Sequence, residues 1–169
     1  TLTEAWQRHI LDSGQLAAHY PPQTKHILDV GSGAGFPGVI IKIFSNEFDL
    51  DCDIELFESN KKKSTFLNEL TKKLDLNIIV NNFRVEDTRK NYDIILCRAV
   101  SSLLNIINMS RDCCKPSSLL ALPKGKNWSK ELIEAKKVWN FKVKLVKNNR
   151  ILDKSGGVTL LINKVKKNK

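Results

Sequence analysis

The residues whose types and spacing suggest chemistry lie in one short segment, Ile27-Leu28-Asp29-Val30-Gly31-Ser32-Gly33-Ala34-Gly35-Phe36-Pro37-Gly38. An apolar run carrying one acid passes through four glycines and leaves through a proline into a helical pattern. Glycines let backbone N–H groups approach a ligand closely and permit positive φ, which is typical of strand-to-helix turns that hold nucleotide-like ligands. An acid just before the turn disfavours a pyrophosphate but suits a cationic sulfonium. The segment therefore predicts an S-adenosylmethionine site that includes Asp29, Gly31, Gly33 and Gly35.

Three other predicted strand ends carry side chains that fit the same ligand. In a doubly wound sheet the ligand lies across the carboxyl ends of the strands. Glu58 closes the second strand, where a carboxylate can accept hydrogen bonds from both hydroxyls of a ribose. Val85 and Glu86 follow the third strand, where backbone groups can bind an adenine edge, although Glu86 also fits a solvated loop acid. Arg98 emerges from the buried fourth strand nearest the reacting centre, with a surface ion pair as the alternative.

The same turn also satisfies a second ligand pattern. Gly33, Gly35 and Gly38 match the G-x-G-x-x-G pattern of NAD-binding folds. The acid at Asp29, the lack of a second βαβαβ half and the antiparallel finish of the chain argue against NAD. An NAD-linked enzyme is therefore the less favoured alternative.

The composition indicates a single domain, residues 1–169, with a partner that carries negative charge. The formal net charge of +10 favours nucleic acid, although a lysine-rich composition also keeps a protein soluble. No apolar run is long enough to span a bilayer, and no signal peptide is visible. None of the four cysteines forms a C-x-x-C pair or has a histidine at ligand spacing, so no metal site is expected. The cysteines indicate a reduced, cytoplasmic protein.

The order of hydrophobic patterns predicts an α/β fold. Strands are expected at residues 26–30, 54–58, 76–81, 92–97, 119–123, 141–146 and 158–163, and helices at 2–18, 38–44, 61–74, 103–113 and 130–138. Repeated βα units imply a mainly parallel seven-stranded sheet, and a loop around residues 155–157 lets the last two strands pair antiparallel. This arrangement is typical of Rossmann-like class I methyltransferases that use S-adenosylmethionine. The leading helix lies within residues 1–20, and the basic tail at 164–169 is expected to fray.

The residues also limit which atom could be methylated. The chain lacks the Asn/Asp-Pro-Pro-aromatic loop that enzymes acting on exocyclic amines need. Cys97 lies at the right strand end for a nucleophile, but it lacks the adjoining proline of carbon-5 enzymes. Guanine N7 has an in-plane lone pair and no hydrogen, so alignment alone can lower the barrier and no general base is required. No catalytic acid or base is therefore assigned.

The chain resembles the RsmG (GidB) family of bacterial 16S ribosomal RNA guanine-N7 methyltransferases. The matching segments occur in the family's order and are Arg8-His9-Ile10-Leu11-Asp12-Ser13, Asp29 to Gly38, Glu58 to Lys63 with Phe66-Leu67, Arg84-Val85-Glu86, Arg98-Ala99 and Leu122-Pro123-Lys124-Gly125. The resemblance implies methylation of one guanine N7 in the 530 loop of small-subunit rRNA, with S-adenosylmethionine as the methyl donor.

The resemblance also implies roles for particular residues. Family positions that contact the cofactor fall on Gly31, Phe36, Val85, Glu86 and Arg98, with Glu58, an Asp in relatives, at the ribose. Family positions around the pocket mouth, where RNA contacts are expected, fall on His9, Arg84 and Lys124. For His9 the alternative is a polar residue held at the helix edge by Asp12 or Ser13.

The partners follow from the same resemblance. The substrate is expected to be 16S rRNA or the small ribosomal subunit, and the protein a cytoplasmic monomer. Family members carry a helical segment before the His-Ile-Leu-Asp-Ser helix, so an upstream segment is expected to be missing here. A relative that binds S-adenosylmethionine or RNA without catalysis is the alternative function.

Overall fold

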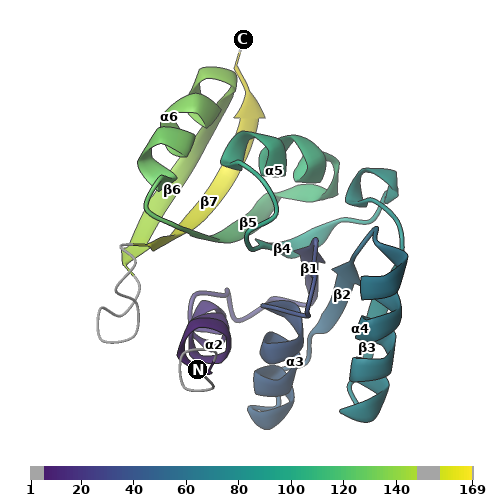
Figure 1. Cartoon of the computed structure of the whole chain (residues 1–169). Helices are drawn as coiled ribbons and strands as arrows, with labels where there is room; N and C mark the ends of the chain where they lie inside the picture. The colour runs from purple at the N-terminus through teal and green to yellow at the C-terminus, as the bar shows by residue number, and fades with distance from the viewer. Residues whose placement is uncertain (1–5, 148–156, 169) are drawn as a thin grey trace.

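The computed structural model describes residues 6–147 and 157–168, which form a seven-stranded sheet (Figure 1). Its strands are β1 (His26–Val30), β2 (Asp53–Phe57), β3 (Ile78–Asn81), β4 (Tyr92–Cys97), β5 (Cys114–Lys124), β6 (Trp139–Lys147) and β7 (Val158–Lys167). Their order is β3-β2-β1-β4-β5-β7-β6. The first five strands in this order pair in parallel, and β7 runs antiparallel to both of its neighbours. The predicted α/β fold with an antiparallel closing strand is confirmed.

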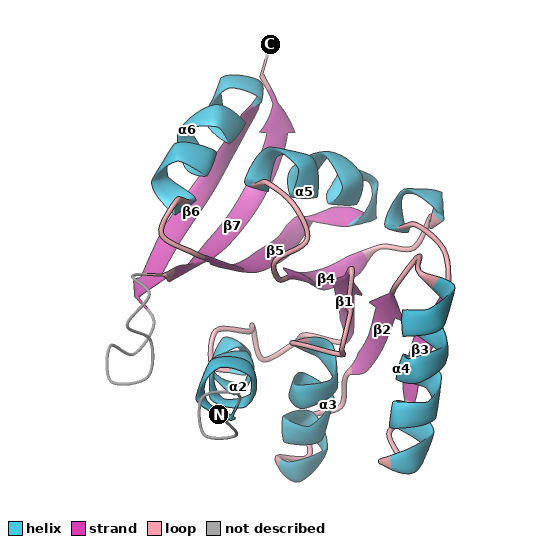
Figure 2. Ribbon diagram, viewed as in Figure 1, coloured by secondary structure: helices cyan, strands magenta, loops and turns pink. Residues whose placement is uncertain are grey.

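Helices cover both faces of the sheet (Figure 2). The helices are α2 (Asp12–Ala17), α3 (Gly38–Glu47), α4 (Lys61–Lys73), α5 (Leu103–Ser110) and α6 (Trp128–Val138), with short turns η1 (Trp6–Leu11), η2 (Val85–Asp87) and η3 (Arg111–Cys113). Apolar residues of α2, α3 and α4 pack on one face, and those of α5 and α6 pack on the other. The central strands are therefore buried on both faces, which explains why they are rich in apolar residues.

Strand β5 begins five residues before the predicted start at Leu119. Residues 115–118 form a bulge, because Tyr92 pairs with Cys114 but Ile94 pairs with Leu119. The Ser118 hydroxyl donates to the carbonyl of Tyr92 at 2.6 Å and accepts from the backbone N–H of Lys115 at 2.7 Å. The hydroxyl thus completes the hydrogen bonding that the bulge interrupts.

The other differences concern where elements end. The predicted helix over 103–113 is divided into α5 and the 3₁₀ turn η3. Residues 164–167 were expected to fray, but they continue β7, where Lys167 pairs with Trp139 of β6. The first residues of the leading helix and most of the 155–157 loop lie outside the described residues. Within the described residues, no helix is long and apolar enough to cross a membrane, and no group of three or more His, Cys, Asp and Glu side chains could hold a metal ion.

Candidate active site

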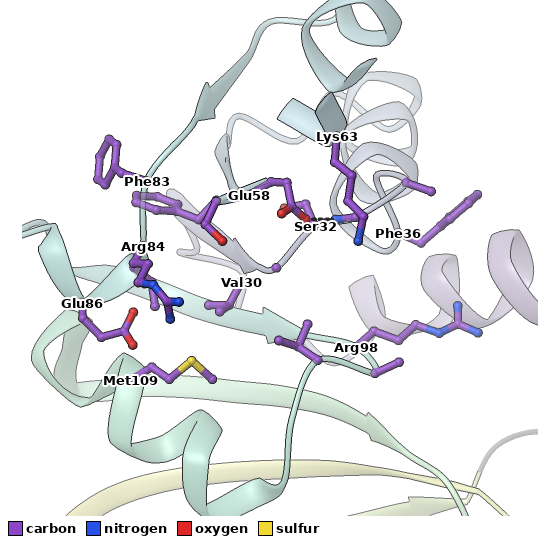
Figure 3. Close-up of a pocket in the computed structure, with 18 of the residues that line it drawn as sticks. Val30, Ser32, Phe36, Glu58, Lys63, Phe83, Arg84, Glu86, Arg98 and Met109 are labelled. Carbon is purple, nitrogen blue, oxygen red and sulfur yellow. Dashed lines mark hydrogen bonds between the residues drawn. The ribbon is translucent and has the colours of Figure 1, made fainter. Parts of the chain in front are cut away.

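A cavity of about 510 Å³ opens at the carboxyl ends of β1, β2 and β4, where the strand order reverses (Figure 3). This is the position at which open α/β sheets bind ligands. The cavity wall includes most of the predicted site residues: His9, Gly31, Gly33, Phe36, Glu58, Arg84, Val85, Glu86 and Arg98. Five segments that are distant in the sequence therefore meet at one site.

The glycine turn forms the floor of the cavity beside β1. Gly31, Gly33 and Gly35 all have positive φ, which L-residues with side chains rarely adopt. A Cβ on Gly31 would also lie 2.5 Å from Val100 Cγ2, so this position has no room for a side chain. The Gly31 N–H donates to the carbonyl of Phe57 at 2.8 Å, which ties the turn to the end of β2. The turn is thereby fixed against the neighbouring strand and exposes bare backbone to the cavity.

Asp29 does not line the cavity, and its predicted contact with the cofactor stays a prediction. The side chain is fully buried behind the turn, and its Oδ2 accepts from the backbone N–H of Gly38 at 2.9 Å. A Cβ on Gly38 would lie 2.7 Å from that same oxygen, so a glycine is needed there. Burial raises the pKa of Asp29 to about 7, against the opposing effect of the Gly38 N–H. The carboxyl group stabilises the turn and the start of α3 from the side that does not face the cavity.

Gly35 was also predicted to belong to the cofactor site, and this too stays a prediction. It is buried, lies outside the cavity wall, and its Cβ position would be 2.7 Å from Val39 Cγ2. Its N–H donates to the carbonyl of Ser32 at 2.7 Å, which closes the turn. Gly35 is therefore required for the turn to enter α3.

Glu58 faces the cavity from the end of β2. The carboxylate is buried, with Oε2 accepting from the N–H of Gly33 at 3.0 Å and Oε1 accepting from the N–H of Asn60 at 2.8 Å. These bonds fix its orientation and leave further lone pairs on both oxygens for a vicinal diol. Asn60 caps α4, because its side chain accepts from the N–H of Lys63 at 3.1 Å. Glu58 is thus free of any capping role.

The third strand end supplies an apolar slot with polar edges. Val85 is buried, and the ring of Phe83 packs edge-on against Phe57 with centroids 5.2 Å apart. In Figure 3 the Glu86 carboxylate points into the space beside Met109. Glu86 is nevertheless exposed, so the geometry is compatible with both predicted roles for its side chain.

The opposite end of the cavity is formed by the segment after β4 and by the leading helix. The ring of His9 stacks on Phe36 with centroids 5.1 Å apart. The His9 carbonyl also accepts from the hydroxyl of Ser13. In Figure 3 the Arg98 side chain extends away from Glu86, so the two charged groups mark opposite ends of the cavity.

Cys97, at the end of β4, is not available as a nucleophile. Its side chain is fully buried, and burial, reinforced by the charge of Asp29, raises the pKa of its thiol to about 12. A thiol with such a pKa stays protonated at neutral pH and is inert. The geometry therefore excludes covalent catalysis through this residue.

Lys124 does not line the cavity, and its predicted contact with RNA stays a prediction. Its ammonium donates to the Ser101 carbonyl at 2.9 Å and to Glu131 Oε2 at 2.8 Å, and its side chain is 7% exposed. The same Glu131 oxygen accepts from the N–H of Leu103 at 2.8 Å. The Lys124–Glu131 pair thus holds the segment between β4 and α5 in place beside the cavity.

Ten residues of the cavity wall were not predicted as site residues, and two of them, Lys63 and Met109, come from helices. Lys63 comes from the first turn of α4, and Met109 from the last turn of α5. Neither position follows a strand end, so no local pattern indicates them. Their place in the wall depends on how the two helices pack against the sheet.

The model of the GidB family, described as rRNA small subunit methyltransferase G, matches residues 1–156. The chain belongs to this family. The protein named Ribosomal RNA small subunit methyltransferase G from Rickettsia felis is 38% identical over 141 residues, which cover 83% of this chain and 70% of the relative. Its namesake from Rickettsia bellii is 39% identical over 137 residues, or 81% of this chain and 68% of the relative. The resemblance noted in the sequence is confirmed.

Solved structures show the same fold at low sequence identity. A SAM-dependent methyltransferase from Aquifex aeolicus matches with a TM-score of 0.68 and 16% identity, over 94% of this chain and 91% of that protein. M. jannaschii TYW2 in complex with AdoMet matches with a TM-score of 0.65 and 14% identity, over 93% of this chain and 74% of that protein. The family member described here therefore has the fold of SAM-dependent methyltransferases.

Proposed function

We propose that this protein transfers a methyl group from S-adenosylmethionine to N7 of one guanine in the 530-loop region of 16S rRNA. The observation that carries the proposal is that Glu58 and the glycine turn meet in one cavity at the reversal of the strand order. Membership of the GidB family, described as rRNA small subunit methyltransferase G, supports the choice of substrate.

The residues around the cavity fit this cofactor. Gly33 presents open backbone to the cavity, because a Cβ there would meet no atom closer than the Gly31 carbonyl oxygen at 3.8 Å, and Glu58 presents two acceptor oxygens to a ribose diol. Val85, Phe83 and Met109 provide apolar surface for a purine ring. When bound, S-adenosylmethionine supplies an electrophilic methyl group on a positively charged sulfur.

The residues of the cavity then have to position the acceptor guanine and exclude water from it. The guanine N7 lone pair forms the new bond to the methyl carbon as the carbon–sulfur bond breaks. The electrons of the broken bond go to sulfur. The positive charge moves to the purine, and no proton is transferred, so no general base is needed. Arg98, His9 and Phe36 surround the end of the cavity where we place this step. Alignment of this kind can supply several kcal/mol of the barrier reduction.

The remaining assignments concern the setting of the reaction. We propose that the protein acts as a monomer in the cytoplasm, on 16S rRNA or on the small subunit that contains it. His9 and Arg84, which line the cavity mouth, are the proposed RNA contacts nearest the reacting atoms.

Two measurements test the proposal. Calorimetry should detect binding of S-adenosylhomocysteine and none of NAD; binding of NAD alone would overturn it. Labelled methyl from S-adenosylmethionine should enter 16S rRNA from a strain that lacks the modification, and should not enter 23S rRNA. Cofactor binding without transfer to either RNA would favour a non-catalytic relative.

A further inference from the structure

The excess positive charge of this protein is confined to one part of its sequence. Residues 111–169 contain 16 of the 28 Lys and Arg residues but 4 of the 18 Asp and Glu residues, a formal charge of +12. Residues 1–110 carry a formal charge of −2 and include every residue of the cofactor cavity wall. The attraction for a polyanion therefore originates mainly outside the cofactor cavity.

A second cavity, of about 480 Å³, lies at the opposite edge of the sheet, where β5 begins and β7 ends. We call it the far cavity. Five cationic side chains from three segments line it: Arg111, Lys115, Lys164, Lys166 and Lys167. One acid, Asp112, accompanies them, and Leu120, Trp139 and Val165 contribute apolar surface. The far cavity is therefore strongly electropositive and has an apolar base.

The cations of the far cavity differ in their partners. Lys115 pairs with Asp93 at 2.7 Å, and the Nε of Arg111 lies 3.5 Å from Asp112. Lys164, Lys166 and Lys167 are exposed, and in the part of the chain that the structure describes none of the three pairs with a carboxylate. Three ammonium groups are thus available to an external anion.

The far cavity is too distant from the cofactor cavity to share its ligand. Strand β5 connects the two edges, with Lys115 at one end and Lys124 at the other. The bulge shortens this span, because residues 114–121 of β5 lie beside only residues 92–96 of β4, so the two ends of β5 are about 20 Å apart. Any anion at the far cavity must therefore belong either to a separate molecule or to a distant part of a large substrate.

We propose that the far cavity binds phosphate groups of the rRNA backbone and anchors the substrate about 20 Å from the site of methyl transfer. This inference rests on the proposed function, because it takes rRNA as the polyanion. Free ammonium groups at a groove with few acids provide the charge complementarity that backbone phosphates require. Lysines at the end of β7 would contribute affinity and orientation rather than selection of the guanine.

A matched pair of double variants tests the proposal. Lys166→Gln/Lys167→Gln removes two adjacent exposed charges at the far cavity, and Lys72→Gln/Lys73→Gln removes two at the end of α4. With deproteinised 16S rRNA, the first variant should bind roughly tenfold more weakly at 0.15 M salt, with a salt slope smaller by about 1 to 2. Its KM for RNA should rise while its affinity for S-adenosylhomocysteine stays unchanged. The second variant should match the wild-type protein.

Each other outcome has a definite meaning. Equal RNA affinities of the two double variants, with methylation by the wild-type protein intact, would overturn the anchor. The lysines would then serve only to discourage pairing with strands of other molecules. A loss seen with small subunits but not with deproteinised rRNA would assign the surface to a ribosomal protein. A wild-type protein that binds S-adenosylhomocysteine but neither binds nor methylates rRNA would overturn the proposed function as well.

A second measurement does not depend on any variant. Acetylation of surface lysines in the wild-type protein, read by mass spectrometry, should show Lys164, Lys166 and Lys167 protected by bound 16S rRNA. Lys72 and Lys73 should react equally with and without RNA. Equal reactivity of all five lysines in the complex would contradict the anchor.

Discussion

At the scale of single residues, two buried carboxyl groups near the glycine turn have different tasks. Asp29 lies behind the turn and binds the N–H of Gly38, whereas Glu58 lies in the cavity wall and binds the N–H of Gly33. Sequence reasoning placed both in the cofactor site because both lie close to a strand end. The distinction depends on which face of the strand each side chain occupies and on what packs there.

Glu58 and Glu86 provide a matched test of the cofactor assignments. Glu58→Gln removes an acceptor oxygen that is already oriented by two backbone N–H groups, so affinity for S-adenosylhomocysteine should fall about 10- to 100-fold. Glu86→Gln should change it less than about threefold, since this region is expected to bind adenine through its backbone. Calorimetry measures both. Equal losses would show that the Glu86 side chain itself contacts the cofactor.

Asp29 should make stability depend on pH. Its pKa rises from 3.8 in the unfolded chain to about 7 in the folded protein, chiefly because it is buried. Between about pH 4 and pH 7 the folded protein therefore binds more protons than the unfolded chain. The free energy of unfolding falls as the pH rises through this window. Relative to Asp29→Asn, the wild-type free energy of unfolding should fall by roughly 3 kcal/mol across it.

Urea unfolding of both proteins at several pH values between 5 and 7.5 measures this difference. Asp93 does not interfere, because hydrogen bonds from Lys115, His26 and Lys25 outweigh its partial burial and lower its pKa to about 2. Parallel pH profiles for the wild-type protein and Asp29→Asn would contradict the assignment.

At the scale of elements, the sequence predicted those strands and turns whose structure depends on consecutive residues. The apolar runs of β1 and β4 and the glycines between β1 and α3 were predictable, because burial on both faces and positive φ leave a signature in consecutive residues. The bulge at the start of β5 was not, because it depends on a hydrogen bond from Ser118 to Tyr92, 26 residues away. Contacts of Lys63 and Met109 with the cavity likewise follow from helix packing.

The Lys124–Glu131 pair is another contact that the sequence pattern did not indicate, and it yields a prediction. Lys124→Met leaves a partly buried carboxylate without its cation, so the free energy of unfolding should fall by about 2 kcal/mol. Since Lys124 faces Ser101 and Glu131 rather than solvent, the salt dependence of RNA binding should stay unchanged. Adding Glu131→Gln should recover part of the lost stability, because the amide oxygen can still accept from Leu103.

Urea unfolding and RNA binding at several salt concentrations measure both effects. A flatter salt dependence for Lys124→Met, like that expected for Lys166→Gln/Lys167→Gln, would contradict a structural role and return Lys124 to the RNA surface. Unchanged stability would show that the pair does not hold the segment before α5.

At the scale of the whole molecule, charge and cavity are separated along the chain. The cofactor cavity is built from the first 110 residues, and the excess of Lys and Arg follows it in the sequence. The net charge predicted a polyanionic partner but could not place the surface that binds it. The fold places Lys164, Lys166 and Lys167 at the far cavity, because β7 runs antiparallel and ends at the opposite edge of the sheet.

The central claim is that one guanine N7 in 16S rRNA receives the methyl group. Small-subunit RNA from a strain lacking the modification would be incubated with the protein and S-adenosylmethionine, then cleaved chemically at 7-methylguanosine. The account predicts cleavage at a single guanine in the 530-loop region, which appears only when both protein and methyl donor are present. Methyl label in the RNA without such cleavage would contradict the assignment to N7, and cleavage at a guanine elsewhere would contradict the assigned target.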